Sequence, residues 1–197
     1  AQAMLNDVHA RLNPTVPALQ RHPQSLTEVR HAILLARRRG LAISIAGGRH
    51  AMGGQQFLQG GLALDMRGMN RVVDFDQQQG LITVEAGATW PELMRGYLSR
   101  QTGRAMQWGI RQKQTGADSL TIGGAIAANI HGRGLAYPPF SADVESLQLL
   151  CADGGLVTCS RQQHPDLFRM VVGGYGVFGV VISARLPMLN TSPTARG

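Results

Sequence analysis

The stretch SIAGGRHAMGGQQF, residues 44–57, constrains the fold more than any other part of the sequence. The apolar run Leu41 to Ala46 predicts a strand that leads directly into this loop. Two Gly-Gly pairs follow, and glycine lets successive backbone N–H groups point toward one anion such as a diphosphate. The spacing matches neither a Gly-Lys-Ser/Thr phosphate loop nor a Gly-x-Gly-x-x-Gly dinucleotide fingerprint. A simple surface loop is the alternative interpretation.

Two more glycine clusters occur later in the chain, at residues 116–124 and 173–179. Glycine allows a ligand to approach the backbone closely. Three such segments indicate one extended, two-ended ligand that contacts backbone along its length.

The remaining sequence alternates between helix and strand patterns. Capping boxes at Ser25–Glu28 and Thr89–Glu92 predict two helices, the first ending at Gly40 and the second near Gly103. Strands are predicted at residues 62–65, 72–75, 81–85 and up to Leu186, and short helices at 122–129 and 164–168.

Composition bounds the class of protein. With 197 residues, 44% of them hydrophobic, the chain suits one compact domain. The formal charge of +7 permits an anionic partner, but the basic residues do not cluster with aromatic residues, so no nucleic-acid binding is expected. No apolar run reaches the ~18 residues of a membrane span. A soluble protein is expected, with a cytoplasmic location favoured and the compartment left open.

The two cysteines flank a hairpin turn. If Asp153 and Gly154 are its central pair, Cys151 faces Leu156 and Cys159 faces Gln148, which disfavours a disulfide between the two cysteines. No zinc-type spacing accompanies them, so no metal site is predicted.

Seven segments occur in an order that resembles a known family: AGGRHAMGG, LDM, VEAGATW, TIGGAIAANIHGRG, ADGGLVTCS, HPDLF and GGYGVFGVV. They resemble the FAD-binding domain of the vanillyl-alcohol-oxidase and p-cresol-methylhydroxylase flavoproteins over nearly the whole chain. The resemblance implies an α+β fold with one domain over residues 1–197. Its two lobes are expected at about 12–86 and 87–187, with 188–197 as a tail or linker and the family's substrate domain apparently absent.

The same resemblance implies a set of FAD-binding residues from both lobes. The diphosphate is expected on the loop after the strand, and the second lobe is expected to line the cofactor and meet its adenosine end. The loop residues are Ala46, Gly47, Gly48, Arg49, His50, Met52 and Gly53, and the second-lobe residues are Gly116, Thr121, Gly123, Gly124, Ala127, Gly179 and Val181.

Two histidines have alternative interpretations. Many relatives bind flavin covalently through a histidine directly after the loop glycine, but Arg49 holds that place here and His50 follows it. Covalent attachment through His50 is therefore one hypothesis, and non-covalent FAD is favoured. In the non-covalent interpretation His50 bonds to the diphosphate or ring edge and Arg49 compensates phosphate charge. His131 either contacts the ring or substrate or is a structural residue of a tight turn. His9, His22, His31 and His164 receive no role.

Three other features have a structural alternative. Asp118 is counted among the cofactor-binding candidates, although helix capping is the commoner role of such a residue. Tyr137 to Phe140 and Trp108 either border the substrate or pack in the core.

The implied activity is that of an FAD-dependent oxidoreductase, oxidase or dehydrogenase, in which flavin accepts a hydride from an alcohol, an amine or an activated C–H. The substrate face and proton-accepting base of this family come largely from a C-terminal domain, so no catalytic residue is assigned. The expected partners are FAD, a small-molecule substrate and a missing substrate domain or partner subunit. The alternative function is an FAD-binding module, subunit or fragment without independent catalysis.

Overall fold

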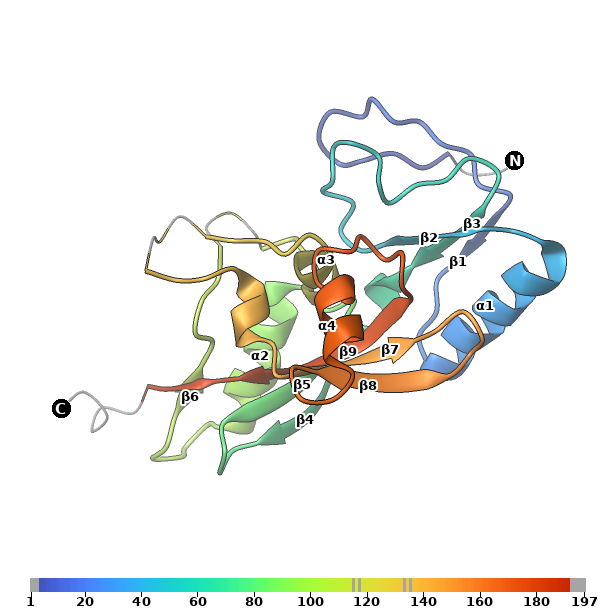
Figure 1. Cartoon of the computed structure of the whole chain (residues 1–197). Helices are drawn as coiled ribbons and strands as arrows, with labels where there is room; N and C mark the ends of the chain where they lie inside the picture. The colour runs from blue at the N-terminus through green and yellow to red at the C-terminus, as the bar shows by residue number, and fades with distance from the viewer. Residues whose placement is uncertain (1–3, 115, 117, 133, 135, 192–197) are drawn as a thin grey trace.

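In the described residues, a three-stranded β-sheet, a five-stranded β-sheet, a two-stranded pair and four α-helices make up the fold seen in a computed structural model (Figure 1). The structure describes residues 4–191 apart from 115, 117, 133 and 135. The smaller sheet is parallel, with strand order β1-β3-β2, where β1 is Leu19–Arg21, β2 is Ile43–Ala46 and β3 is Leu62–Asp65. Helix α1, Leu26–Arg39, connects β1 to β2.

The larger sheet is antiparallel, with strand order β4-β5-β9-β7-β8. Its strands are β4 (Val72–Asp76), β5 (Leu81–Glu85), β7 (Ser146–Leu150), β8 (Leu156–Ser160) and β9 (Val180–Pro187). Three helices pack against it, namely α2 (Trp90–Arg100), α3 (Ile122–Ala127) and α4 (Pro165–Val171). A separate two-stranded pair joins β6 (Trp108–Gly109) to β10 (Leu189–Asn190). The predicted α+β fold is thus confirmed.

Local sequence accounts for the helix ends. The Ser25 hydroxyl accepts the Glu28 N–H at 3.2 Å, and Gly40 ends α1 with φ of 62°. At α2 the Glu92 carboxylate accepts the Thr89 N–H at 2.7 Å, as the capping box predicts. This helix ends at Arg100, earlier than expected, and Gly103 lies in the turn that follows.

The core has two hydrophobic clusters. One joins the larger sheet to α2, α3 and α4, and includes Trp90 and Phe140 in edge-to-face contact. The other packs Val29 and Ile33 of α1 on the smaller sheet, together with Leu150 and Ile182 of the larger sheet. Because this second cluster draws residues from both sheets, it fixes one sheet relative to the other.

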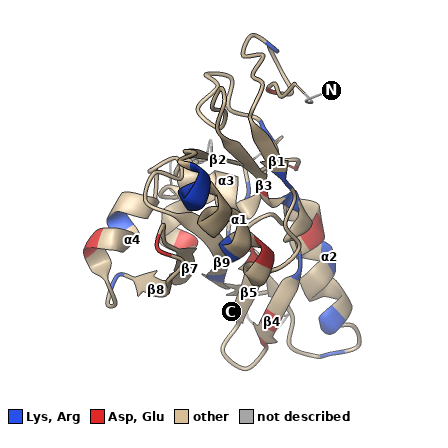
Figure 2. Cartoon of the chain, turned by 90° about the vertical axis from the view of Figure 1, so that its right-hand side faces the viewer, with Lys and Arg blue, Asp and Glu red and all other residues tan. Residues whose placement is uncertain are grey.

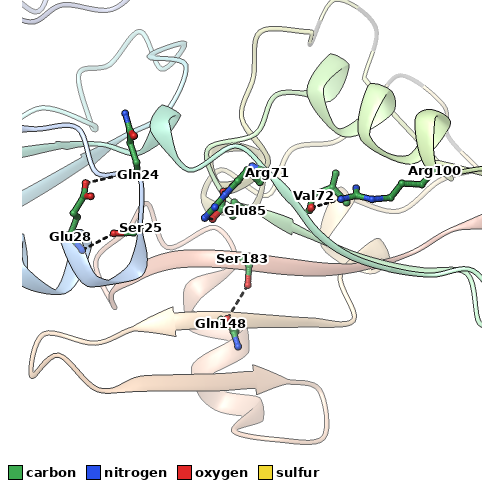
Figure 3. A network of polar contacts seen from close by, with 9 residues as sticks. All are labelled: Gln24, Ser25, Glu28, Arg71, Val72, Glu85, Arg100, Gln148 and Ser183. Atoms are coloured by element: carbon green, nitrogen blue, oxygen red, sulfur yellow. Dashed lines mark hydrogen bonds and ion pairs between the residues drawn. The ribbon is translucent and has the colours of Figure 1, made fainter.

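Two carboxylates close to strand ends are held by arginines. Glu85, which is 4% exposed, accepts hydrogen bonds from the main-chain N–H and the guanidinium of Arg71 (Figure 3). At the end of β3, burial alone would raise the pKa of Asp65, but hydrogen bonds from Arg67 outweigh burial and lower it.

Two features of the structure lie near the expected lobe boundary and tail. Strands β4 and β5 belong to the larger sheet, because β5 pairs with β9, so the change of sheet along the chain falls before Val72. At the start of the segment 188–197, Met188 is buried and β10 pairs with β6. Residues 192–197 lie outside the described residues.

The structure corrects the predicted hairpin register. Its loop has three residues, Ala152 to Gly154, with Gly154 at φ of 87°, so Cys159 pairs with Leu147 and not with Gln148. Likewise, Cys151 N–H bonds to the carbonyl of Gly155 and not to Leu156. Both cysteines are free thiols, which confirms the expected absence of a disulfide between them.

Both signs of charge occur on the helices. Figure 2 shows Lys or Arg positions together with Asp or Glu positions on α1, α2 and α4, where the acidic residue lies in the first turn and a basic residue in the last. Within the described part of the chain, no helix is long and apolar enough to cross a membrane, and no cluster of three His, Cys, Asp or Glu residues has metal-binding geometry.

Candidate cofactor site

A cavity of about 290 Å³ lies between the loop that follows β2 and the segments around α3 and β9. Its walls therefore come from both sheets. Eleven predicted site residues line it: Ala46, Gly47, Gly48, Arg49, His50, Thr121, Gly123, Gly124, Ala127, Gly179 and Val181. No carboxylate is among the described residues that line it, and most of this described wall is aliphatic, aromatic or glycine.

The loop after β2 presents main-chain donors. Among the described residues, the N–H groups of Gly47, Gly48, Arg49 and His50 have no hydrogen-bond acceptor. Buried N–H groups are normally paired, so a row of unpaired donors at a cavity wall suits an anionic ligand. The sequence prediction of a diphosphate loop rests on the same glycines.

Close contact between the two halves of the site explains Gly47. A Cβ added there would lie 2.1 Å from Thr121 Oγ1, which is closer than real Cβ atoms approach. Thr121 is 2% exposed and its hydroxyl accepts the Gly124 N–H at 3.2 Å, so it is the N-cap of α3. Glycine at 47 thus lets the loop touch the start of α3.

Arg49 adds a cationic group to the same wall. Its backbone has φ of 59°, and its buried Nε atom has no partner in the part of the chain that the structure describes. It also forms no ion pair with any described carboxylate. Gln56 lies nearby on the wall, with its Nε2 donating to the Ala51 carbonyl at 2.8 Å and its buried Oε1 unpartnered among the described residues. Unpaired buried polar atoms of both kinds suit a ligand with acceptors and donors.

Both ring nitrogens of His50 already have protein partners. Nδ1 lies 2.9 Å from Nε2 of His9, and the ring also hydrogen-bonds the main chain of Ser119. Burial lowers the pKa of His50, the Ser119 bond raises it and His9 lowers it, with a net decrease from the ordinary value of 6.5. His50 is therefore expected to be neutral at pH 7.

The glycines of α3 serve by their size. The Gly123 N–H donates to the Ala86 carbonyl at 2.7 Å, so it is not available to a ligand. A Cβ at Gly123 would lie 2.9 Å from the Ala86 Cβ, which shows why glycine is needed there. Backbone donors at the cavity thus come from the loop after β2 and not from this residue.

The segment between α4 and β9 forms a further wall that the sequence analysis identified only in part. Tyr175, Gly176 and Phe178 line the cavity beside the predicted Gly179. Tyr175 has φ of 49° and its N–H donates to the Ala127 carbonyl at 3.1 Å, which ties this segment to α3. The glycine cluster 173–179 was the available signal, but its aromatic residues were overlooked. Other lining residues that the sequence analysis missed are Ile45, Ala51, Gln55, Gln56, Met66, Ala86, Leu120, Ala128, Ile130 and Val171.

Five predicted residues do not line this cavity: Met52, Gly53, Gly116, Asp118 and His131. Asp118 is exposed and pairs with Lys113 at 2.5 Å, and it does not cap α3, because Thr121 holds that position. His131 is exposed, and its Nδ1 lies 3.1 Å from the Gly132 carbonyl, as in its structural interpretation.

The aromatic candidates divide between core and surface. Phe140 is buried against Trp90, and Trp108 donates its indole N–H to the Gln77 carbonyl at 2.9 Å, which are structural roles. Tyr137 is 55% exposed and does not line the cavity.

Comparison with known proteins identifies the class. The model of a family described as FAD binding domain matches residues 17–160, and the chain therefore belongs to this family of FAD-binding domains. Its cavity fits that cofactor, because unpaired loop N–H groups, an unpaired arginine nitrogen and the lack of any lining carboxylate suit a diphosphate, while the apolar walls suit flat rings.

Similar proteins are oxidoreductases. The chain is 29% identical to an uncharacterized oxidoreductase of the fasciation locus of Rhodococcoides fascians, over 97% of this chain and 41% of that protein. It is 29% identical to L-gulonolactone oxidase of Mus musculus over 86% of this chain and 37% of that protein. Cytokinin dehydrogenase 2 of Oryza sativa is 30% identical over 82% of this chain and 29% of that protein.

A solved structure shares the fold. 6-Hydroxy-D-nicotine oxidase from Arthrobacter nicotinovorans superposes with a TM-score of 0.75 at 21% identity, over 96% of this chain and 39% of that one. The chain spans about two fifths or less of the length of these four proteins.

Proposed function

We propose that FAD occupies the cavity between the two sheets, with its diphosphate on the loop Gly47–His50. We also propose that the domain is of the vanillyl-alcohol-oxidase and p-cresol-methylhydroxylase type. The observation that carries the placement is the row of four loop N–H groups without an acceptor among the described residues, beside the unpaired Nε of Arg49. Main-chain N–H groups bind phosphate oxygens, and a guanidinium adds a charge-assisted bond. The apolar residues of the α3 and β9 walls would then contact the rings.

We propose non-covalent binding on the position of His50. Covalent attachment would require an imidazole nitrogen of His50 to leave its present partner and turn to the flavin, and Nδ1 lies 2.9 Å from His9 Nε2 while the ring also hydrogen-bonds the main chain of Ser119. His50 contributes a neutral, half-buried ring to the wall of the site. This supports the favoured sequence hypothesis over covalent attachment.

Bound FAD would supply hydride-accepting chemistry toward an alcohol, amine or activated C–H substrate. The loop Gly47–His50 would hold the diphosphate, and the apolar residues of the α3 and β9 walls would hold the rings and exclude water. None of the lining residues is a carboxylate or lysine suited to remove a substrate proton, and His50 is engaged on both ring nitrogens. We assign that proton transfer to another domain or subunit.

The alternative is an FAD-binding module without independent turnover. It is favoured by the length comparison, in which the chain matches at most 41% of the curated relatives described above. Exposed apolar residues beside the cavity, Tyr175, Val177 and Phe178, also suit a covering partner.

Two measurements test the proposal. Titration of FAD fluorescence is expected to give saturable, stoichiometric binding, and Arg49→Ala is expected to weaken it. Gly132→Ala is a suitable control, because an added Cβ there meets no atom of the described residues within 4 Å. Absence of binding to the unaltered chain would refute the proposal. Anaerobic addition of alcohols and amines then separates an enzyme, whose flavin absorbance is bleached, from a module, whose absorbance persists.

A further inference from the structure

The N-terminal segment, residues 4–15, lies against the loop after β2 (Figure 1). An isolated bridge between Leu5 and Thr15 closes it into a hairpin-like loop. Two hydrogen bonds join it to the loop after β2, from the Val8 N–H to the Arg49 carbonyl at 3.1 Å and from Asn13 Nδ2 to the Met52 carbonyl at 2.7 Å. The segment precedes residues 17–160, which match the family model.

A buried carboxylate gives this segment a defined shape. Asp7 is 2% exposed and accepts hydrogen bonds from the main-chain N–H of His9 at 2.9 Å and of Arg11 at 3.1 Å. It also accepts a bond from the Asn13 amide at 3.2 Å. These bonds fix the backbone of His9, so the position of its side chain next to His50 is built into the segment.

The tautomer of His50 follows from its two partners. The Ser119 carbonyl oxygen and His50 Nε2 are neighbours at Gly48, 2.4 Å and 3.1 Å from the position that a Cβ would take there. The Ser119 bond also raises the pKa of His50, as an accepting carbonyl does. His50 must therefore carry a proton on Nε2. In the neutral ring Nδ1 is then an acceptor, and the proton between the two imidazoles belongs to His9 Nε2, at 2.9 Å.

We propose that His9 is a positioning residue of the FAD site, which holds His50 in the Nε2-protonated tautomer with its ring fixed between Ser119 and the N-terminal segment. This inference rests on the proposed function for its effect on FAD, but the tautomer itself is a property of the chain without cofactor. His50 lines the cavity and is the last residue of the proposed diphosphate loop Gly47–His50. Fixing its ring therefore also restrains the N–H groups of that loop. His9 itself does not line the cavity and needs no contact with FAD.

Three variants separate this role from a general structural one. His9→Ala removes the donor, His9→Gln places an amide N–H at a similar reach, and His31→Gln changes an exposed histidine of α1 as a control. His9 is exposed and outside both hydrophobic clusters, so all three variants are expected to fold, which thermal unfolding checks.

The primary readout is the ¹⁵N NMR spectrum of the histidine rings in the full chain without FAD. We expect His50 to show the Nε2-protonated tautomer in the unaltered chain and in His9→Gln. In His9→Ala one of the two bonds that favour this tautomer is lost and the Ser119 bond remains, so we expect a partial shift toward the Nδ1-protonated tautomer and a raised pKa. An unchanged tautomer and pKa of His50 in His9→Ala would overturn the proposal.

The secondary readout is FAD affinity. Without His9 the His50 ring and its loop must be ordered when FAD binds, and an ordering cost of about 1 kcal/mol corresponds to roughly fivefold weaker binding in His9→Ala, with affinity restored in His9→Gln and unaltered in His31→Gln. Equal FAD affinity in His9→Ala and the unaltered chain would overturn the link to the cofactor. If the unaltered chain binds no FAD, the proposed function fails while the tautomer result still decides the role of His9.

Discussion

Gly47→Ala is the substitution whose effect the structure specifies most closely. The new Cβ would lie 2.1 Å from Thr121 Oγ1 and 3.0 Å from its Cγ2, so the atoms are about 0.9 Å closer than the 3.0 Å below which real Cβ atoms essentially never approach. Either the loop moves away from α3 or the Thr121 side chain rotates and loses its cap on the Gly124 N–H. Overpacking of this kind costs about 1–3 kcal/mol of unfolding free energy.

A double-mutant cycle measures this contact directly. Thr121→Ala alone is expected to cost about 1 kcal/mol through the lost cap. In that background the nearest remaining Thr121 atom, Cβ, is 3.1 Å from the new Cβ, so Gly47→Ala should cost less than in the unaltered chain. Coupling energies between residues in contact reach about 0.5–3 kcal/mol.

Urea unfolding followed by tryptophan fluorescence provides the assay, since Trp90 is buried in the core of the larger sheet. Gly132→Ala is the matched control, with open space around its added methyl. The reasoning would be refuted if Gly47→Ala were as stable as the unaltered chain, or if its cost were the same with threonine and with alanine at position 121.

Three further predictions concern charged groups. Arg49→Ala should weaken FAD binding by roughly 10- to 100-fold, since a hydrogen bond to a charged group contributes about 1.5–3 kcal/mol, whereas Arg38→Ala at the exposed end of α1 should leave the titration curve unchanged. Glu85→Ala should lower the urea-derived unfolding free energy by roughly 1–3 kcal/mol, because the main-chain N–H of Arg71 loses its acceptor, and a loss below that range would contradict this account. Because the pKa of Asp65 is lowered in the folded chain, its stabilising contribution is present above its ordinary pKa of 3.8 and is lost as the pH falls through the lower folded value. The unfolding midpoint should therefore fall with pH below 3.8 less steeply in Asp65→Asn than in the unaltered chain, and equal slopes would argue against it.

Local sequence rules predicted most helices and strands and the glycine loop after β2, and the family resemblance supplied the cavity residues of the second lobe. The capping residues Ser25 and Thr89 mark helix starts because a cap bonds its own first turn. Gly47 and Gly123 were recognised because they lie in glycine clusters. Only a residue without a side chain permits the close contacts that the loop after β2 and α3 make, so a cluster of glycines in the sequence indicates such contacts.

Features that depend on distant parts of the chain were not predicted. Strand β5 pairs with β9, about a hundred residues later, and no local pattern reveals this partner. The hairpin register depends on whether the loop that contains Gly154 has two or three residues. The residues around Gly154 are compatible with both loop lengths, so the sequence alone did not determine the register. His9 received no role because its partner, His50, is 41 residues away and the contact exists only after folding.

The central claim is that this chain binds FAD non-covalently in the cavity between its sheets. It is tested most directly by the visible absorbance spectrum of the protein after incubation with FAD and removal of free cofactor, recorded before and after acid precipitation. We predict flavin bands in the protein fraction, which then leave with the acid supernatant. Bands retained in the pellet would contradict the inference from His50, and absence of flavin bands from the protein fraction would contradict the assignment of the cavity as an FAD site.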